Sequence, residues 1–181
     1  AGLAIADRFT TLARQGQQEI RNLQEGVSYA QTAEGALGSQ QEMAQRVREL
    51  AVQASSGTLS DDQRAALNAE AQQLLGQIDE TAKNTEYNGQ NLLNQDTAVG
   101  LGTQGSLQVS TTESTTSSLG LGSLDLSTAG GAQAAVGALD TALNRISQNR
   151  SALGAQTNRF TSAIEQREIQ VENSLSAESA I

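Results

Sequence analysis

The stretch VGALDTALNRISQNRSALGAQTNRFTSAIEQREIQVENSLSAESAI, residues 136–181, decides the fold. Its apolar residues advance in steps of three and four positions, the heptad spacing of a helix that buries one narrow seam against another helix. The seam consists of Val136, Leu139, Leu143, Ile146, Leu153, Phe160, Ile164, Val171 and Ile181. Such a stripe is too narrow to stabilise a helix by itself, so this segment needs a helical partner.

The N-terminal part of the chain carries a matching stripe, and it predicts a helix from about Leu3 to Ala54. The spacing shifts once, near Gly16. The stripe consists of Phe9, Leu12, Ile20, Leu23, Val27, Ala30, Leu37, Ala44, Val47, Ala51 and Ala54. Because the simplest partner for the last helix is the first one, the sequence predicts a mainly α fold with a small β region. Its long antiparallel helices form an elongated, coiled-coil-like rod.

A second helix is indicated between these two. Ser60 and Gln63 have the spacing of a capping box, and Asp61 and Asp62 favour the positive end of a helix dipole. The helix is expected to end near Asn84. The acidic pair is interpreted as helix capping rather than as a calcium site, because no further oxygen ligands follow at loop spacing.

The middle of the chain differs from both ends in its residue pattern. The Asn-Gly turn in residues 87–90 and short bursts of leucine and valine after it predict three or four short strands, paired in hairpins. The Ser- and Thr-rich residues 110–118 are expected to form a solvated turn, and Gly130 and Gly131 to precede the last helix. We therefore assign residues 1–90 and 129–181 to a helical rod domain and residues 91–128 to a short β-hairpin region.

The composition excludes several classes of function. The 181 residues include no cysteine, histidine, tryptophan or proline, so disulfides, ordinary zinc sites and imidazole bases are absent from the sequence. The net charge of −9 disfavours nucleic acid and is typical of a soluble protein. No apolar run approaches the roughly 18 residues of a membrane span. We expect no catalytic residues, no enzyme activity, no metal and no cofactor.

One row of residues late in the first helix allows two interpretations. Arg46, Leu50 and Gln53 lie on the flank of the seam, and an exposed arginine beside a leucine makes a plausible anchor for a partner. Alternatively, Leu50 is the edge of the core and Arg46 a solvated charge. The residues alone favour the second interpretation.

Several segments resemble, in order, the rod of bacterial flagellin. They are Asp7–Phe9, Gln31–Leu37, Gln45–Gln53, Thr85–Gly89 and Leu153–Phe160. The resemblance covers nearly the whole chain apart from Gly100–Gly130. It implies a structural subunit of the flagellar filament, secreted to the extracellular flagellum and serving motility, whose partners are other flagellin subunits. The family's extreme ends are missing from the resemblance, so the chain is expected to be a non-polymerising, monomeric core fragment with little or no outer domain.

The resemblance also implies that this surface is a ligand for the flagellin-sensing Toll-like receptor of innate immunity. Arg46 and Leu50 match the principal contacts, and Gln53 matches a neighbouring one. Glu70 matches an acidic contact on the second helix, and Arg159 is a weaker candidate on the last helix. Leu74 stands where some receptor-activating members carry an arginine.

Two alternatives share some of these features. A hook–filament junction protein has similar terminal helices and can carry a stretch like Gly57–Asp62, whereas the segment Glu86–Leu93 favours flagellin. A coiled-coil secretion-system tip or adhesin stalk would be a binding module, with a lipid or a host protein as its partner.

Overall fold

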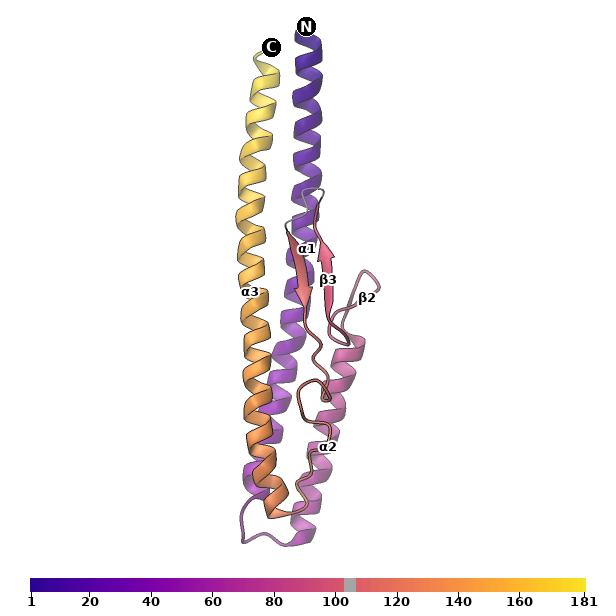
Figure 1. Cartoon of the computed structure of the whole chain (residues 1–181), viewed down its shortest axis with the longest axis vertical. Helices are drawn as coiled ribbons and strands as arrows, with labels where there is room; N and C mark the ends of the chain where they lie inside the picture. The colour runs from indigo at the N-terminus through magenta and orange to yellow at the C-terminus, as the bar shows by residue number, and fades with distance from the viewer. Residues whose placement is uncertain (103–106) are drawn as a thin grey trace. The chain divides into compact units, whose positions relative to one another are not determined.

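The computed structural model describes residues 1–102 and 107–181, and it confirms a mainly α fold with little β structure. The elements are α1 (Gly2–Ala54), α2 (Asp61–Asn84), β1 (Glu86–Tyr87), β2 (Gln90–Asn91), β3 (Thr97–Gly100), β4 (Gln108–Thr111) and α3 (Ala129–Ser179) (Figure 1). All three helices occur where the sequence predicted them, and the bounds of α1 and α2 agree within about two residues. The start of α3 differs: Gly130 and Gly131 do not precede this helix but lie in its first turn.

The chain divides into two units, and both α1 and α3 contribute to each. Unit 1 comprises Ala1–Gln31, Ala98–Ser110 and Gly154–Ile181, and unit 2 comprises Thr32–Thr97 and Thr111–Leu153. The proposed domains, residues 1–90 with 129–181 and residues 91–128, stay a prediction, and residues 103–106 of the second lie outside the described part.

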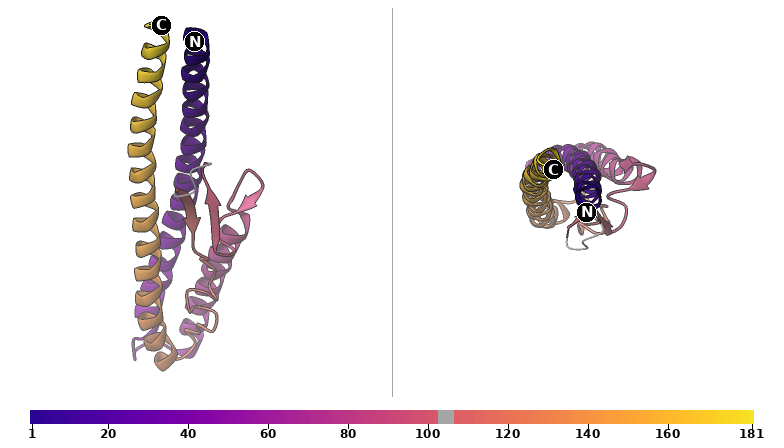
Figure 2. Two further views of the ribbon diagram at one scale, coloured as in Figure 1. Left: turned by 45° about the horizontal axis from the view of Figure 1, so that its top comes forward. Right: turned by 90° about the horizontal axis from the view of Figure 1, so that it is seen from above.

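Unit 2 is built on the predicted heptad seams. Segments of α1, α2 and α3 lie side by side (Figures 1 and 2). The apolar residues that each segment buries recur at helical spacing. The fully buried members of this core include Leu37, Val47 and Ala51 of α1, Ile78 and Ala82 of α2, and Leu139 and Ile146 of α3. The alanines among them let the helix axes come close, and each buried leucine or isoleucine contributes about 1.5–3 kcal/mol.

A polar residue, Gln40, occupies a seam position between Leu37 and Ala44 and is completely buried. Its amide Nε2 donates to the carbonyl of Ile78 at 3.0 Å and to the carbonyl of Ser114 at 2.8 Å. The Ser114 hydroxyl in turn donates to Gln40 Oε1 at 2.7 Å. Because a buried amide needs all these partners, Gln40 fixes the register of α1 against α2 and against the segment that holds Ser114.

That segment corrects two expectations. Residues 110–118 are not a solvated turn, because Ser114 is fully buried and Thr111 and Thr116 are nearly so. Asp79 of α2 accepts hydrogen bonds from the Thr116 amide at 2.8 Å and from its hydroxyl at 2.7 Å. The predicted strands around Leu119–Leu126 are also wrong: residues 112–128 form turns and bends. Side chains of the helices satisfy this backbone where a neighbouring strand would otherwise do so.

The connection from α1 to α2 is closed by a buried arginine. Ser60 and Gln63 form the predicted capping box, with the two amide contacts at 2.9 and 3.2 Å. One turn on, Arg64 is only 7% exposed; its Nε donates to the Ala54 carbonyl at 2.9 Å and its Nη2 to the Ser56 carbonyl at 2.8 Å. The Arg64 guanidinium therefore donates hydrogen bonds to carbonyl groups that the C-terminal end of α1 leaves unpaired. Its positive charge also interacts favourably with the negative end of the helix dipole.

Unit 1 contains the two ends of the chain, which lie beside each other with α1 and α3 antiparallel (Figures 1 and 2). Glu19 of α1 and Arg167 of α3 form an ion pair at 2.7 Å, and the Thr10 hydroxyl donates to Glu178 at 2.8 Å. Gly16, where the heptad spacing shifts, packs directly on Val171. A Cβ there would meet the Val171 side chain at 2.5 Å, so the close approach of the two helices requires glycine.

The strands form two antiparallel hairpins. In β1–β2, Asn88 and Gly89 both have positive φ, 52° and 75°, which is the geometry that an Asn-Gly hairpin turn requires, so the predicted turn is confirmed. The strands β3 and β4 also pair, and Leu101, directly after β3, packs against Gly26 of α1 in unit 1. The Gln156 side chain of α3 holds its other side, accepting from the Ser110 amide at 2.9 Å and donating to the Ser110 carbonyl at 3.1 Å.

We predict that Gln40→Leu lowers the free energy of unfolding by about 2–4 kcal/mol, measured by urea denaturation with circular dichroism. Leucine fills the volume but leaves the buried hydroxyl and carbonyl of Ser114 without partners, at about 1–3 kcal/mol each. The control is Gln45→Leu, an exposed position one turn on, which should change stability by less than about 0.5 kcal/mol. Equal stability of the two variants would show that the amide does not hold this segment.

Candidate interaction surface

Arg46 and Glu70 form an exposed contact between α1 and α2 in unit 2. Arg46 Nε and Nη2 donate to the same carboxylate oxygen of Glu70 at 3.1 and 3.0 Å, and Nη1 donates to Glu49 at 3.2 Å. The side chains of Arg46 and Glu70 are 51% and 45% exposed. The structure therefore brings together two predicted contact residues that the sequence places on separate helices.

The pKa of Arg46 is raised above its ordinary value, mainly by the hydrogen bonds to Glu70 and Glu49, so the guanidinium keeps its charge. Exposed ion pairs of this kind add little to stability, because water screens the charges. Their effect here is positional, because two carboxylates hold the guanidinium against the surface of α2. Three of its five N–H groups are used in these bonds, which leaves two for water or a partner.

Leu50, one turn after Arg46, is only 1% exposed and belongs to the core. The interpretation as an exposed apolar anchor is wrong for this residue, and the interpretation favoured by the residues alone, an edge of the core, is confirmed. The physical reason is the number of helices. A two-helix seam leaves the flank of α1 open, whereas in unit 2 α2 also packs on α1, so the buried arc of α1 is wider.

The remaining predicted contacts are more scattered. Gln53 is exposed near the end of α1, and Leu74 is half-buried on α2 one turn after Glu70. Arg159 is exposed on α3, but it belongs to unit 1. The structure thus gathers Arg46 and Glu70 directly, places Gln53 on the same unit, and puts Arg159 on the other one.

The sequence did not predict the ion pair between Arg48 and Asp140, which also lies in unit 2. Arg48 Nε donates to Asp140 of α3 at 2.6 Å, and this hydrogen bond raises the pKa of Arg48. Sequence reasoning also missed Gln40, for which a signal exists: the three-four spacing puts position 40 on the seam. Arg64 had no such signal, because its partners are backbone carbonyls of another helix end.

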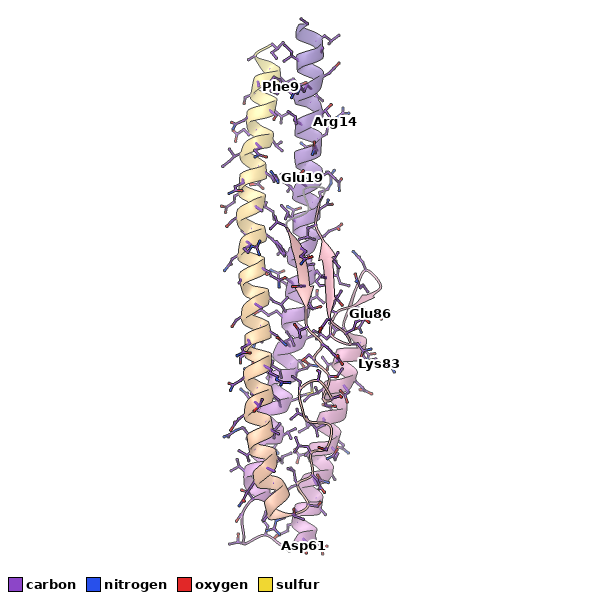
Figure 3. All side chains as sticks on the ribbon, viewed as in Figure 1. Phe9, Arg14, Glu19, Asp61, Lys83 and Glu86 are labelled. Carbon is purple, nitrogen blue, oxygen red and sulfur yellow. The ribbon has the colours of Figure 1, made fainter. Side chains whose placement is uncertain are left out.

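Unit 1 carries a different kind of surface, rich in exposed apolar side chains. Among the described residues, six of the seven large apolar side chains that remain exposed lie in unit 1, the exception being Val52. They are Leu3, Ile5, Leu12, Ile169, Leu175 and Ile181, and their exposed fractions range from 42% to 78%. Figure 3 shows side chains projecting outward from both helices here.

The described residues offer no sign of metal chemistry or of a membrane span. Residues 1–102 and 107–181 contain no group of three or more acidic side chains placed to hold an ion. Within the same ranges, no helix combines the length and the apolar character that crossing a bilayer requires.

Comparisons with known proteins agree on one family. The profile of the bacterial flagellin N-terminal helical region matches residues 1–98. A flagellin of Halalkalibacterium halodurans is 38% identical over all of this chain and 69% of its own length. A 31.3 kDa flagellar filament core protein of Treponema maltophilum is 30% identical over the whole chain and 71% of its length. The crystal structure of Bacillus cereus flagellin superposes with a TM-score of 0.72 at 31% identity, covering 81% of this chain and 88% of that one.

We predict that Leu50→Ala lowers the free energy of unfolding by about 2–5 kcal/mol, because it opens a cavity in a close-packed core. Arg46→Ala, its neighbour on the surface, should leave the free energy of unfolding nearly unchanged. Both are measured by urea denaturation followed by circular dichroism. Comparable losses in the two variants would contradict the assignment of Leu50 to the core and Arg46 to the surface.

Proposed function

The chain belongs to the bacterial flagellin family, and we propose that it acts as a structural subunit of the extracellular flagellar filament, in motility. Its relatives are named as flagellins and as a filament core protein, which favours this function over a hook–filament junction protein or an adhesin stalk. Its role is structural: it works by packing against other flagellin subunits. That the 181 residues alone remain monomeric stays a prediction.

The exposed apolar side chains of unit 1 carry this proposal. A protein that works alone seldom leaves this many large apolar side chains exposed in one unit, and exposed apolar surface often marks where another molecule binds. Ile169, on α3, is 59% exposed, and Leu12, on α1, is 45% exposed. Contact with neighbouring subunits would bury both.

The test replaces these side chains by charged ones. We expect Leu12→Glu with Ile169→Glu to shorten filaments at least tenfold in electron micrographs and to abolish swarming, because a charge cannot be buried unpaired in a subunit contact. The control is Lys83→Glu, an exposed change on α2 in unit 2 (Figure 3), which should leave filaments normal. Export is followed separately by quantifying the protein in the medium. Filaments of normal length from the exported double variant would overturn this assignment.

A second function, recognition by the flagellin-sensing Toll-like receptor, is favoured by one observation. Two residues predicted as receptor contacts from separate helices, Arg46 and Glu70, touch each other on an exposed face. We infer that Arg46 is the charged contact and that Glu70 and Glu49 hold it in place. Leu50 acts from beneath, by keeping this part of α1 in position.

A charge swap separates the ion pair from the contact. Arg46→Glu should weaken signalling in a receptor reporter assay at least tenfold, and adding Glu70→Arg should restore the ion pair without restoring the signal. The matched control is Arg48→Glu, which reverses an arginine whose partner, Asp140, lies on α3. This variant should leave signalling unchanged. Unchanged signalling by a folded Arg46→Glu protein would refute receptor contact through this arginine.

A further inference from the structure

Unit 1 has a groove between α1 and α3 with an apolar floor and an acidic rim. Ile20, Val171 and Leu175 contribute the floor, and Glu168 and Glu172 stand at its edge. The volume of the groove is about 550 Å³. Leu175 is 42% exposed there, so the floor is open to solvent.

The carboxylates beside this groove are not neutralised within the described part of the chain. Glu165, Glu168 and Glu172 are exposed, and the ion pair described in unit 1, Glu19 with Arg167, involves none of them. Because residues three, four and seven apart lie on the same side of a helix, the three form one acidic row. From Glu165 to Glu172 this row spans about 10 Å.

A basic row of the same length lies on α1. Arg14 (labelled in Figure 3) and Arg21 are exposed, and neither has a carboxylate partner among the described residues. Arg21 donates to the Gln18 side chain at 2.7 Å, which leaves its charge uncompensated. The two arginines are also seven residues apart, so their spacing along the helix is again about 10 Å.

We propose that the groove holds the Arg14–Arg21 row of a second copy of this chain. The guanidinium groups would pair with the acidic row, and the methylene stems of the arginines would cover Ile20 and Leu175. Because one copy supplies the groove and the other the basic row, the contact is head-to-tail and can continue from copy to copy into an open assembly. This inference rests on the proposed filament function and assigns it a specific contact.

The test uses two charge-reversed forms of the protein as its cell makes it. One form carries Glu168→Arg with Glu172→Arg, and the other carries Arg14→Glu with Arg21→Glu. Each alone should need at least tenfold more protein to assemble at low salt, measured by sedimentation and electron microscopy. An equimolar mixture should assemble like wild type, because alternating copies restore opposite charges at every contact. Raising the salt should reduce the difference between variants and wild type in the protein concentration needed for assembly, because salt screens the charges.

The control is Glu80→Arg, a reversal on the exposed face of α2, which should assemble normally, and circular dichroism establishes that every form is folded. Failure of the mixture to recover, or normal assembly by either reversed form, overturns the groove contact. If the wild type forms filaments in that experiment, the proposed filament function stands even when the groove contact is overturned. If the wild type forms none, both proposals fall together.

Discussion

Everything in this molecule depends on burying narrow apolar stripes that no single helix can bury for itself. With aromatic residues at only 2% of the chain, the stripes consist mostly of alanine, leucine, valine and isoleucine. Such seams stabilise by close approach of helix backbones rather than by bulky side chains. That constraint explains why Gly16 is tolerated inside a helix: the Val171 side chain occupies the space that a side chain at position 16 would need.

The same constraint makes polar residues at the seam informative. An apolar stripe of this kind can slide by one heptad with little loss, because the same residue types recur. Gln40 removes that freedom, since its amide finds all its partners in one arrangement of α1, α2 and the segment with Ser114. A single buried amide plays the same role in coiled coils, where it specifies register.

Periodicity alone predicted α1 and α3 and most of their buried residues, because each heptad position depends on local spacing. Two residues placed on the seams, Leu12 and Ile181, are exposed instead. Periodicity could not predict how many helices share one face. Leu50, expected on the flank, lies in the core because α2 packs there. Ser114, expected in a solvated turn, is buried because helix side chains rather than water are its hydrogen-bond partners. The resemblance named Arg46 and Glu70 as receptor contacts, but the contact between the two was not predicted, since 24 residues and a helix connection separate the positions. Spacing within one helix carries no information about such a pair.

The closure of α1 by Arg64 has a consequence for how the protein meets proteases. Of the eleven lysines and arginines in the chain, this one lies in the loop-proximal first turn of α2, a place where trypsin-like enzymes commonly cut. Its side chain is occupied by the carbonyls of Ala54 and Ser56 and cannot enter a specificity pocket without releasing the end of α1. The helix connection is thereby shielded from digestion by the very residue that would otherwise mark it for cleavage.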